Sequence, residues 1–222
     1  MTTARDFIDA TKKALAAGES RIRGHGVVVA VENGQADGGL LRSFCGNQYQ
    51  MWKPNEEARS VSMFRFADHP CQSVFLTPPE VEKQASAAFS TLGKCVGLDD
   101  PDSFEPTAAA FGYAAYKAWL VCYGSAAEIA CAWALNLSAW GCNCGLMSHG
   151  LRAHYGLDCQ DTAFLDSFAG MPSFEETAVQ VIEHDLNEGV LPVAITRAAR
   201  MMQEYELMFW DAMAAHGQDP AD

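Results

Sequence analysis

Apolar side chains recur at steps of three and four residues along nearly the whole chain, which is the spacing of one face of an α-helix. This pattern predicts helices over residues 3–17, 39–52, 79–92, 106–123, 126–149, 161–169, 173–187 and 191–215. The one strand-like run, residues 26–31, is short and isolated. We therefore expect an all-α multi-helix bundle, formed as a single domain over residues 1–222, because one core can support that length.

The longest predicted helix crosses a segment without charge, residues 129–147. Polar and small residues interrupt this run, and no second apolar segment of similar quality with basic flanks accompanies it. A buried central helix explains the pattern better than a membrane span. Asn136 is then the polar residue of this segment that faces the centre of the bundle.

The last helix carries a carboxylate, Glu206, inside its apolar stripe. The stripe repeats every three or four residues and consists of Ile195, Ala199, Met202, Phe209 and Met213. Burying an ionised carboxylate costs several kcal/mol unless it is paired or hydrogen-bonded. Two interpretations stay open: a functional acid, or a structural Glu satisfied by a neighbouring Arg or Tyr.

Charge and cysteine content limit the partners of this protein. The net charge of −13 and the scattered basic residues exclude a nucleic-acid partner, because phosphate binding depends on clustered Lys and Arg. The amphipathic start has no signal-peptide pattern, so we expect a cytoplasmic protein without a membrane partner. The eight cysteines show no zinc-type spacing and are expected to be reduced thiols that behave mostly as small hydrophobes.

The start of the penultimate predicted helix, residues 173–187, has a sequence signal of its own. Ser173 and Glu176 have the Ser-x-x-Glu spacing of a capping box, in which each side chain bonds the other residue's backbone N–H. We expect this box to begin the helix.

Three stretches resemble the TenA family, the thiaminase II-like proteins of the haem-oxygenase-like superfamily, which also contains PqqC-type proteins. They are Phe44 to Tyr49, the segment from Tyr113 to Glu128, and the run Tyr205-Glu206-Leu207-Met208-Phe209-Trp210-Asp211. The resemblance implies a haem-oxygenase-like helical bundle, a dimer or tetramer of identical chains, and a central site for a small pyrimidine-like ligand related to thiamin. It implies no cofactor and no metal.

The resemblance gives roles to particular residues. Glu206 matches the family's late acid, which shuttles protons, and Tyr113 matches one of its tyrosines. Asn136 is expected to hydrogen-bond the ligand. The remaining expected ligand-binding residues are mostly aromatic and are Trp140, Phe168, Phe44, Met51, Tyr49 and Trp210.

The chain also departs from the family pattern at the residues that do the chemistry. Asn136 stands at the position of the cysteine nucleophile, and an amide cannot attack carbon as a thiolate does. Met51 stands at the position of the carboxylate that holds the pyrimidine. Cys131 and Cys142 lie about 120° to 140° around the helix from Asn136, and Cys144 lies roughly 12 Å along it. We therefore expect altered or lost chemistry, and whether the protein is an enzyme stays open.

Two alternatives belong to other functional classes. One is a protein that binds its ligand without converting it. The other is an iron oxidase, for which the available ligands are Glu128, His184, Asp185, Glu188 and Glu206. The residues Glu183-His184-Asp185 are better interpreted as a solvated helix face.

Overall fold

Helices make up all the regular structure in the computed structural model, which describes residues 3–75 and 79–216. They are α1 (Ala4–Arg23), α2 (Gly26–Glu32), α3 (Gly38–Arg65), α4 (Pro79–Cys95), α5 (Ala108–Tyr123), α6 (Ala126–His154), α7 (Ala163–Ala169), α8 (Glu175–Asn187) and α9 (Pro192–His216). Two short 3₁₀ turns, η1 (Gln72–Phe75) and η2 (Pro101–Ser103), lie between helices. The predicted all-α bundle is confirmed.

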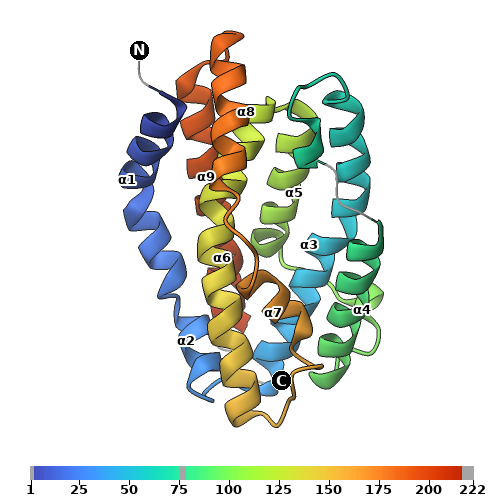
Figure 1. The fold of residues 1–222 in the computed structure, drawn as a ribbon. Helices are drawn as coiled ribbons and strands as arrows, with labels where there is room; N and C mark the ends of the chain where they lie inside the picture. Colours follow the sequence, from blue (N-terminus) through green and yellow to red (C-terminus); the bar gives the residue numbers. More distant parts are fainter. Residues whose placement is uncertain (1–2, 76–78, 217–222) are drawn as a thin grey trace.

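Helix α6 lies at the centre of the fold, as Figure 1 shows, and packs against α1, α2, α7, α8 and α9. Its first turn is fixed by a capping box, in which Ser125 and Glu128 each bond the other's backbone N–H. Most of its uncharged middle section is buried, which confirms the prediction of a central helix. No helix in the part of the chain described above is long and apolar enough to span a membrane.

The strand-like residues 26–31 form helix α2. Three of its valines, Val27, Val28 and Val31, are buried; this spacing lies on one helix face, whereas in a strand Val28 would point away from the other two. The His25 side chain caps the helix by accepting a hydrogen bond from the Val27 N–H at 3.3 Å. Gly150 of α6 admits the helix closely, because a Cβ at that position would lie 2.3 Å from the Val31 carbonyl oxygen.

The predicted capping box at the start of α8 is wrong. Phe174 is the residue that precedes the helix, and the Ser173 hydroxyl accepts a hydrogen bond from the Glu175 N–H instead, at 3.3 Å. Glu176 turns toward α1 and pairs with Arg5 at 2.5 Å. Because the Glu176 side chain is engaged by Arg5 of α1, it does not form the bond to the backbone that the capping box requires.

Helices α5 and α9 pack along each other, and both also contact α3 and α6. Neighbouring residues on these helices face opposite ways. On α5, Gly112 faces outward and Tyr113 inward, and on α9 Tyr205 faces outward and Glu206 inward. The same pair of helices therefore forms both the inner site and an outer groove.

Candidate functional site

Glu206 lies in the interior of the bundle with no exposed surface. The apolar stripe around it, from Ile195 to Met213, is buried as the sequence pattern predicted. Burial raises the pKa of the Glu206 carboxyl from its ordinary 4.5 to about 7, because the charged form loses its hydration. Hydrogen bonds from Trp210 and Asn136 and the charge of Lys117 act in the opposite direction.

A hydrogen-bonded chain connects Glu206 to two other helices. The Tyr113 hydroxyl of α5 donates to Asn136 Oδ1 of α6 at 2.8 Å. Asn136 Nδ2 donates in turn to Glu206 Oε2, and Trp210 Nε1 donates to Glu206 Oε1 at 3.2 Å. Glu206 is thus satisfied by an amide and an indole, and not by the Arg or Tyr that the structural interpretation of the sequence named.

Aromatic rings surround this chain. Trp210 stacks on Phe44 of α3, with ring centroids 5.8 Å apart and an interplanar angle of 9°, and lies 5.6 Å from Trp140 of α6. Trp140 meets Phe168 of α7 edge-on at 6.0 Å. The structure therefore brings together most of the predicted site residues: Glu206, Tyr113, Asn136, Trp140, Phe168, Phe44 and Trp210.

Tyr49 and Met51 lie in other surroundings. The Tyr49 hydroxyl donates to Asp102 Oδ1 at 3.1 Å, and its ring stacks on Phe89 of α4 at 6.3 Å. Met51 is buried in the core. Neither residue is tied to Glu206 by the hydrogen bonds and ring contacts that join the other predicted residues.

Lys117 is a site residue that the sequence interpretation missed. It follows Tyr113 by one helical turn, and its ammonium nitrogen lies over the Tyr113 ring, 5.7 Å from the centroid. Burial lowers the pKa of Lys117 to about 8, against the opposing effect of the negative charge on Glu206. The spacing of four residues from Tyr113 was the signal that could have identified it.

Besides Lys117, the Cys144 thiol of α6 is a further titratable group whose pKa is affected by Glu206. Burial raises the pKa of the Cys144 thiol well above its ordinary value, and the negative charge of Glu206 adds to that increase. The pKa of Cys131 on the same helix is raised to about 12 by burial alone. All eight cysteines are free thiols, but Cys95, Cys122 and Cys159 are exposed, so the expectation of mostly hydrophobic packing holds only for part of the set.

Two amides on α3 have buried oxygens without a hydrogen-bond partner, Asn47 Oδ1 and Gln48 Oε1. They follow Phe44 by three and four residues, so they share its inward face. A buried polar atom without a partner costs free energy, and at a binding site a bound ligand commonly satisfies it.

The five predicted metal ligands do not converge on one point. Glu206 is central, Glu128 caps α6, and Glu188 ends α8 and is exposed. His184 and Asp185 instead lie with His69, so that one ligand atom from each falls within 4.8 Å of the others. The interpretation of this region as a solvated face is wrong for Asp185, which is 6% exposed.

The protonation of His69 argues against metal binding in this cluster. Its Nδ1 accepts a hydrogen bond from the Cys71 N–H at 3.0 Å, which leaves the ring proton on Nε2, 3.1 Å from Asp185 Oδ1. The other Asp185 oxygen accepts from the Ala127 N–H at 2.8 Å. A metal would have to displace that proton, whereas the observed bonds already join α8, the start of α6 and the loop around His69.

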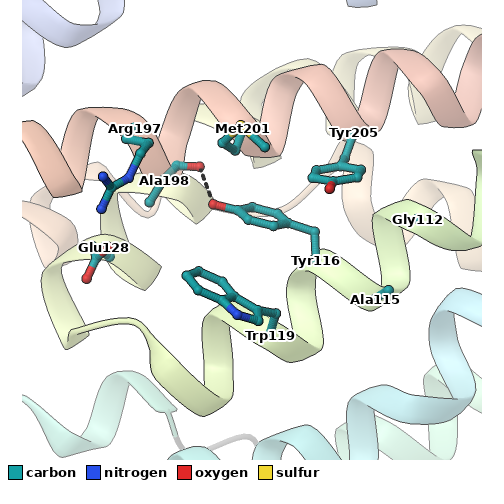
Figure 2. Close-up of a pocket in the computed structure, with 9 residues that line it drawn as sticks. All are labelled: Gly112, Ala115, Tyr116, Trp119, Glu128, Arg197, Ala198, Met201 and Tyr205. Atoms are coloured by element: carbon teal, nitrogen blue, oxygen red, sulfur yellow. Dashed lines mark hydrogen bonds between the residues drawn. The ribbon is translucent and has the colours of Figure 1, made fainter.

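An outer groove of about 510 Å³ lies on the opposite side of the α5–α9 pair, and Figure 2 shows its lining. The residues that line it are Gly112, Ala115, Tyr116, Trp119, Glu128, Arg197, Ala198, Met201 and Tyr205. Tyr116 stacks between Tyr205 and Trp119, at 4.9 Å and 6.0 Å, and its hydroxyl donates to the Ala198 carbonyl at 3.2 Å. Half of the Trp119 side-chain surface is exposed.

Comparison with solved structures identifies the fold. No protein-family model matches the sequence, and no curated protein matches it. A TenA homologue from Pseudomonas syringae superposes with a TM-score of 0.77 at 13% identity, covering 93% of this chain and 92% of its own. A TenA homologue from P. horikoshii gives 0.73 at 15% identity, covering 95% and 99%. Heme oxygenase from the cyanobacterium Synechocystis gives 0.63 at 15% identity, covering 92% and 90%.

The fold and the site together define an all-helical protein with a haem-oxygenase-like fold and a buried acid at its centre. Within that fold, the chain resembles TenA homologues over almost its full length.

Proposed function

We propose that this protein binds a small pyrimidine-like heteroaromatic related to thiamin beside Glu206, and that Glu206 exchanges protons with it. The observation that carries the proposal is the buried chain Tyr113–Asn136–Glu206–Trp210 within an aromatic wall. An acid whose pKa is about 7 both donates and accepts protons near neutral pH. Ring nitrogens and amino groups of a pyrimidine are groups that a carboxyl of this kind can protonate or bind.

The chemistry differs from cysteine-based hydrolysis. Both ends of the Asn136 amide are used in hydrogen bonds, one to Glu206 and one from Tyr113, so this residue connects the acid to the tyrosine. The Cys144 thiol is buried and its pKa is raised, which keeps it protonated and a poor nucleophile. The proposal is therefore proton transfer at a bound heteroaromatic, with retention without conversion as the alternative.

Binding and turnover are tested together. The purified protein is titrated with thiamin and with 4-amino-5-aminomethyl-2-methylpyrimidine, following both the thermal midpoint and product release by chromatography. We expect the pyrimidine to raise the midpoint, and Glu206→Gln to weaken that shift and to abolish any turnover. Glu204→Gln, at an exposed position of the same helix, should retain both. An equal shift in Glu206→Gln and the unmodified protein would contradict the proposed role of Glu206.

Association of identical chains is part of the same proposal. Large apolar side chains are exposed on the outer face of α5 and α9, namely Phe111, Trp119, Tyr123 and Met208. Exposed apolar clusters of this kind commonly mark interfaces. Light scattering on the purified protein measures the mass directly, and a monomer at micromolar concentration would contradict the expected dimer or tetramer.

A further inference from the structure

Lys117 differs from the other lysines whose side chains the structure describes. Lys12 pairs with Glu175, and Lys13, Lys83 and Lys94 are exposed. Lys117 is half-buried on the inner side of α5 and forms no ion pair or hydrogen bond with any residue in the described ranges. Its amine nitrogen is not completely enclosed, because Nζ has no hydrogen-bond partner among the described residues and keeps some surface accessible to solvent.

The groups around Glu206 differ in their capacity to act as nucleophiles. Burial raises the pKa of Tyr113 and of Cys144, so the phenol and the thiol both keep their protons. Asn136 is an amide. Burial has the opposite consequence for Lys117, because lowering the pKa of an ammonium to about 8 leaves a significant fraction of uncharged amine near neutral pH.

We infer that Lys117 is an amine nucleophile that forms a reversible imine with an aromatic aldehyde or ketone held beside Glu206. This assigns to the centre of the bundle a covalent binding site for carbonyl compounds. The inference rests on the proposed function to the extent that both place a flat heteroaromatic beside Glu206. The geometry places the amine at this centre: Lys117 Nζ lies 5.7 Å from the centroid of the Tyr113 ring, and Tyr113 is joined to Glu206 through Asn136. The neighbouring side chains are aromatic, with Tyr113 and Trp140 packed 5.9 Å and 6.2 Å from Phe209, and such rings favour contact with a flat ligand.

The reaction needs no oxidant or reductant. The lone pair of the uncharged Lys117 amine attacks the carbonyl carbon, and the carbonyl oxygen takes the proton of the Glu206 carboxyl. The nitrogen then returns a proton to the Glu206 carboxylate, and that proton leaves with the hydroxyl group as water when the C=N bond forms. The resulting iminium nitrogen gives its remaining proton to the Glu206 carboxylate. The net change is amine plus carbonyl to imine plus water, and Glu206 ends in its starting form.

Reductive trapping tests this directly. The full chain is incubated with pyrimidine-5-carbaldehyde and sodium cyanoborohydride, which converts an imine to a stable secondary amine, and labelled lysines are located by peptide mass spectrometry. We expect Lys117 to be labelled well before the exposed Lys94. In Lys117→Arg, which keeps the positive charge, labelling at this position is lost and labelling at Lys94 is unchanged.

Glu206→Gln tests whether Glu206 acts as a general acid in imine formation or only affects Lys117 through its charge. We expect this variant to slow labelling of Lys117 by roughly a hundredfold, the size of a typical general acid contribution. Cyclohexanecarbaldehyde should label Lys117 more slowly than the aromatic aldehyde, and equal rates would contradict the aromatic class of ligand. Circular dichroism of each variant verifies that it is folded.

Labelling of Lys117 and binding of the aminopyrimidine are separate measurements, and each can succeed or fail without the other. Labelling of Lys117 at the rate of Lys94 overturns the inference, even if the aminopyrimidine binds and the proposed function stands. Rapid labelling of Lys117 supports the inference, even if the aminopyrimidine does not bind and the proposed function fails.

Discussion

The buried centre and the outer groove are built from the same two helices, α5 and α9, yet they differ in how their polar atoms are satisfied. In the centre, Tyr113 and Glu206 meet through Asn136 with almost no exposed surface. In the groove, Tyr116 and Tyr205 stack beside a half-exposed Trp119, as Figure 2 shows. Both Tyr113 and Tyr116 are largely buried, but the Tyr113 hydroxyl meets the Asn136 side chain and the Tyr116 hydroxyl meets a backbone carbonyl. The comparison teaches that the partner of the hydroxyl, more than the residue type, decides whether a tyrosine joins the hydrogen-bonded chain to Glu206.

Tryptophan truncation should give the largest difference between the two regions. Trp210→Ala removes a fully buried ring that touches Phe44 and Trp140 and leaves Glu206 Oε1 without its donor, so we expect a loss of about 3–5 kcal/mol of unfolding free energy. Trp119→Ala in the groove should cost less than about 1 kcal/mol, since half of this side chain is already exposed. Urea denaturation measures the unfolding free energy of both variants, and similar losses would contradict the expected difference between the buried centre and the groove.

The pH dependence of stability should follow the centre and not the groove. The pKa of Glu206 is raised to about 7 in the folded protein, so the folded state holds this proton more tightly than the unfolded state does. The resulting stabilisation is complete below the ordinary value of 4.5 and is lost as the pH rises through about 7, by up to about 3 kcal/mol.

Glu206→Gln should remove this contribution, which is seen by repeating urea denaturation between about pH 5 and about pH 8. Tyr116→Phe in the groove is the matched control, because the pKa of Tyr116 is raised to about 12 and its hydroxyl does not titrate in that range. A wild-type pH profile in Glu206→Gln would show that another group causes the dependence.

Removing single hydroxyl groups compares two tyrosines one helical turn apart. Tyr113→Phe leaves Asn136 Oδ1 buried without its donor, so we expect a cost of about 2 kcal/mol. Tyr116→Phe loses a bond of 3.2 Å to the Ala198 carbonyl at the edge of the groove, at a cost below about 1 kcal/mol. Equal costs by chemical denaturation would mean that the groove side is as isolated from water as the centre.

The smallest effect is expected at the floor of the groove. A Cβ on Gly112 would lie 3.4 Å from the Tyr205 ring, which is close to an ordinary contact. Because alanine favours a helix interior over glycine, Gly112→Ala should stabilise the protein by up to about 1 kcal/mol. Thermal unfolding checks this, and a clear loss of stability would mean that the Tyr205 ring cannot shift.

Much of the fold follows from local patterns that the sequence displays directly. The helical spacing predicted each main helix, although α3 continues to Arg65, well past the predicted end at residue 52, and the uncharged run predicted that α6 is central. The valine-rich residues 26–31 show the limit of this reasoning, because the helix they form depends on a cap from His25 and on the space left by Gly150. Helix ends depended on distant partners too, as Arg5 shows by drawing Glu176 away from its predicted box.

The candidate site divides in the same way. The position of Glu206 in an apolar stripe and the resemblance at Tyr113 and Asn136 identified three residues that the structure joins by hydrogen bonds. The signal for Lys117 was weaker, a spacing of four residues from Tyr113, because a lysine on a helix is normally exposed and only the packing of α5 turns this one inward. Asp185 was misjudged for the same reason, since its burial depends on its contacts with His69 and the start of α6.

The sequence by itself therefore determined that this protein is an all-helical bundle and that an acid lies in the apolar stripe of its last helix. Both properties are periodic or local, and a linear pattern records them. Tertiary structure alone decided which groups share the environment of Glu206, how far its pKa rises, and that an unpaired amine lies nearby. These depend on desolvation and on distances between residues far apart in the chain, which arise only when the helices pack.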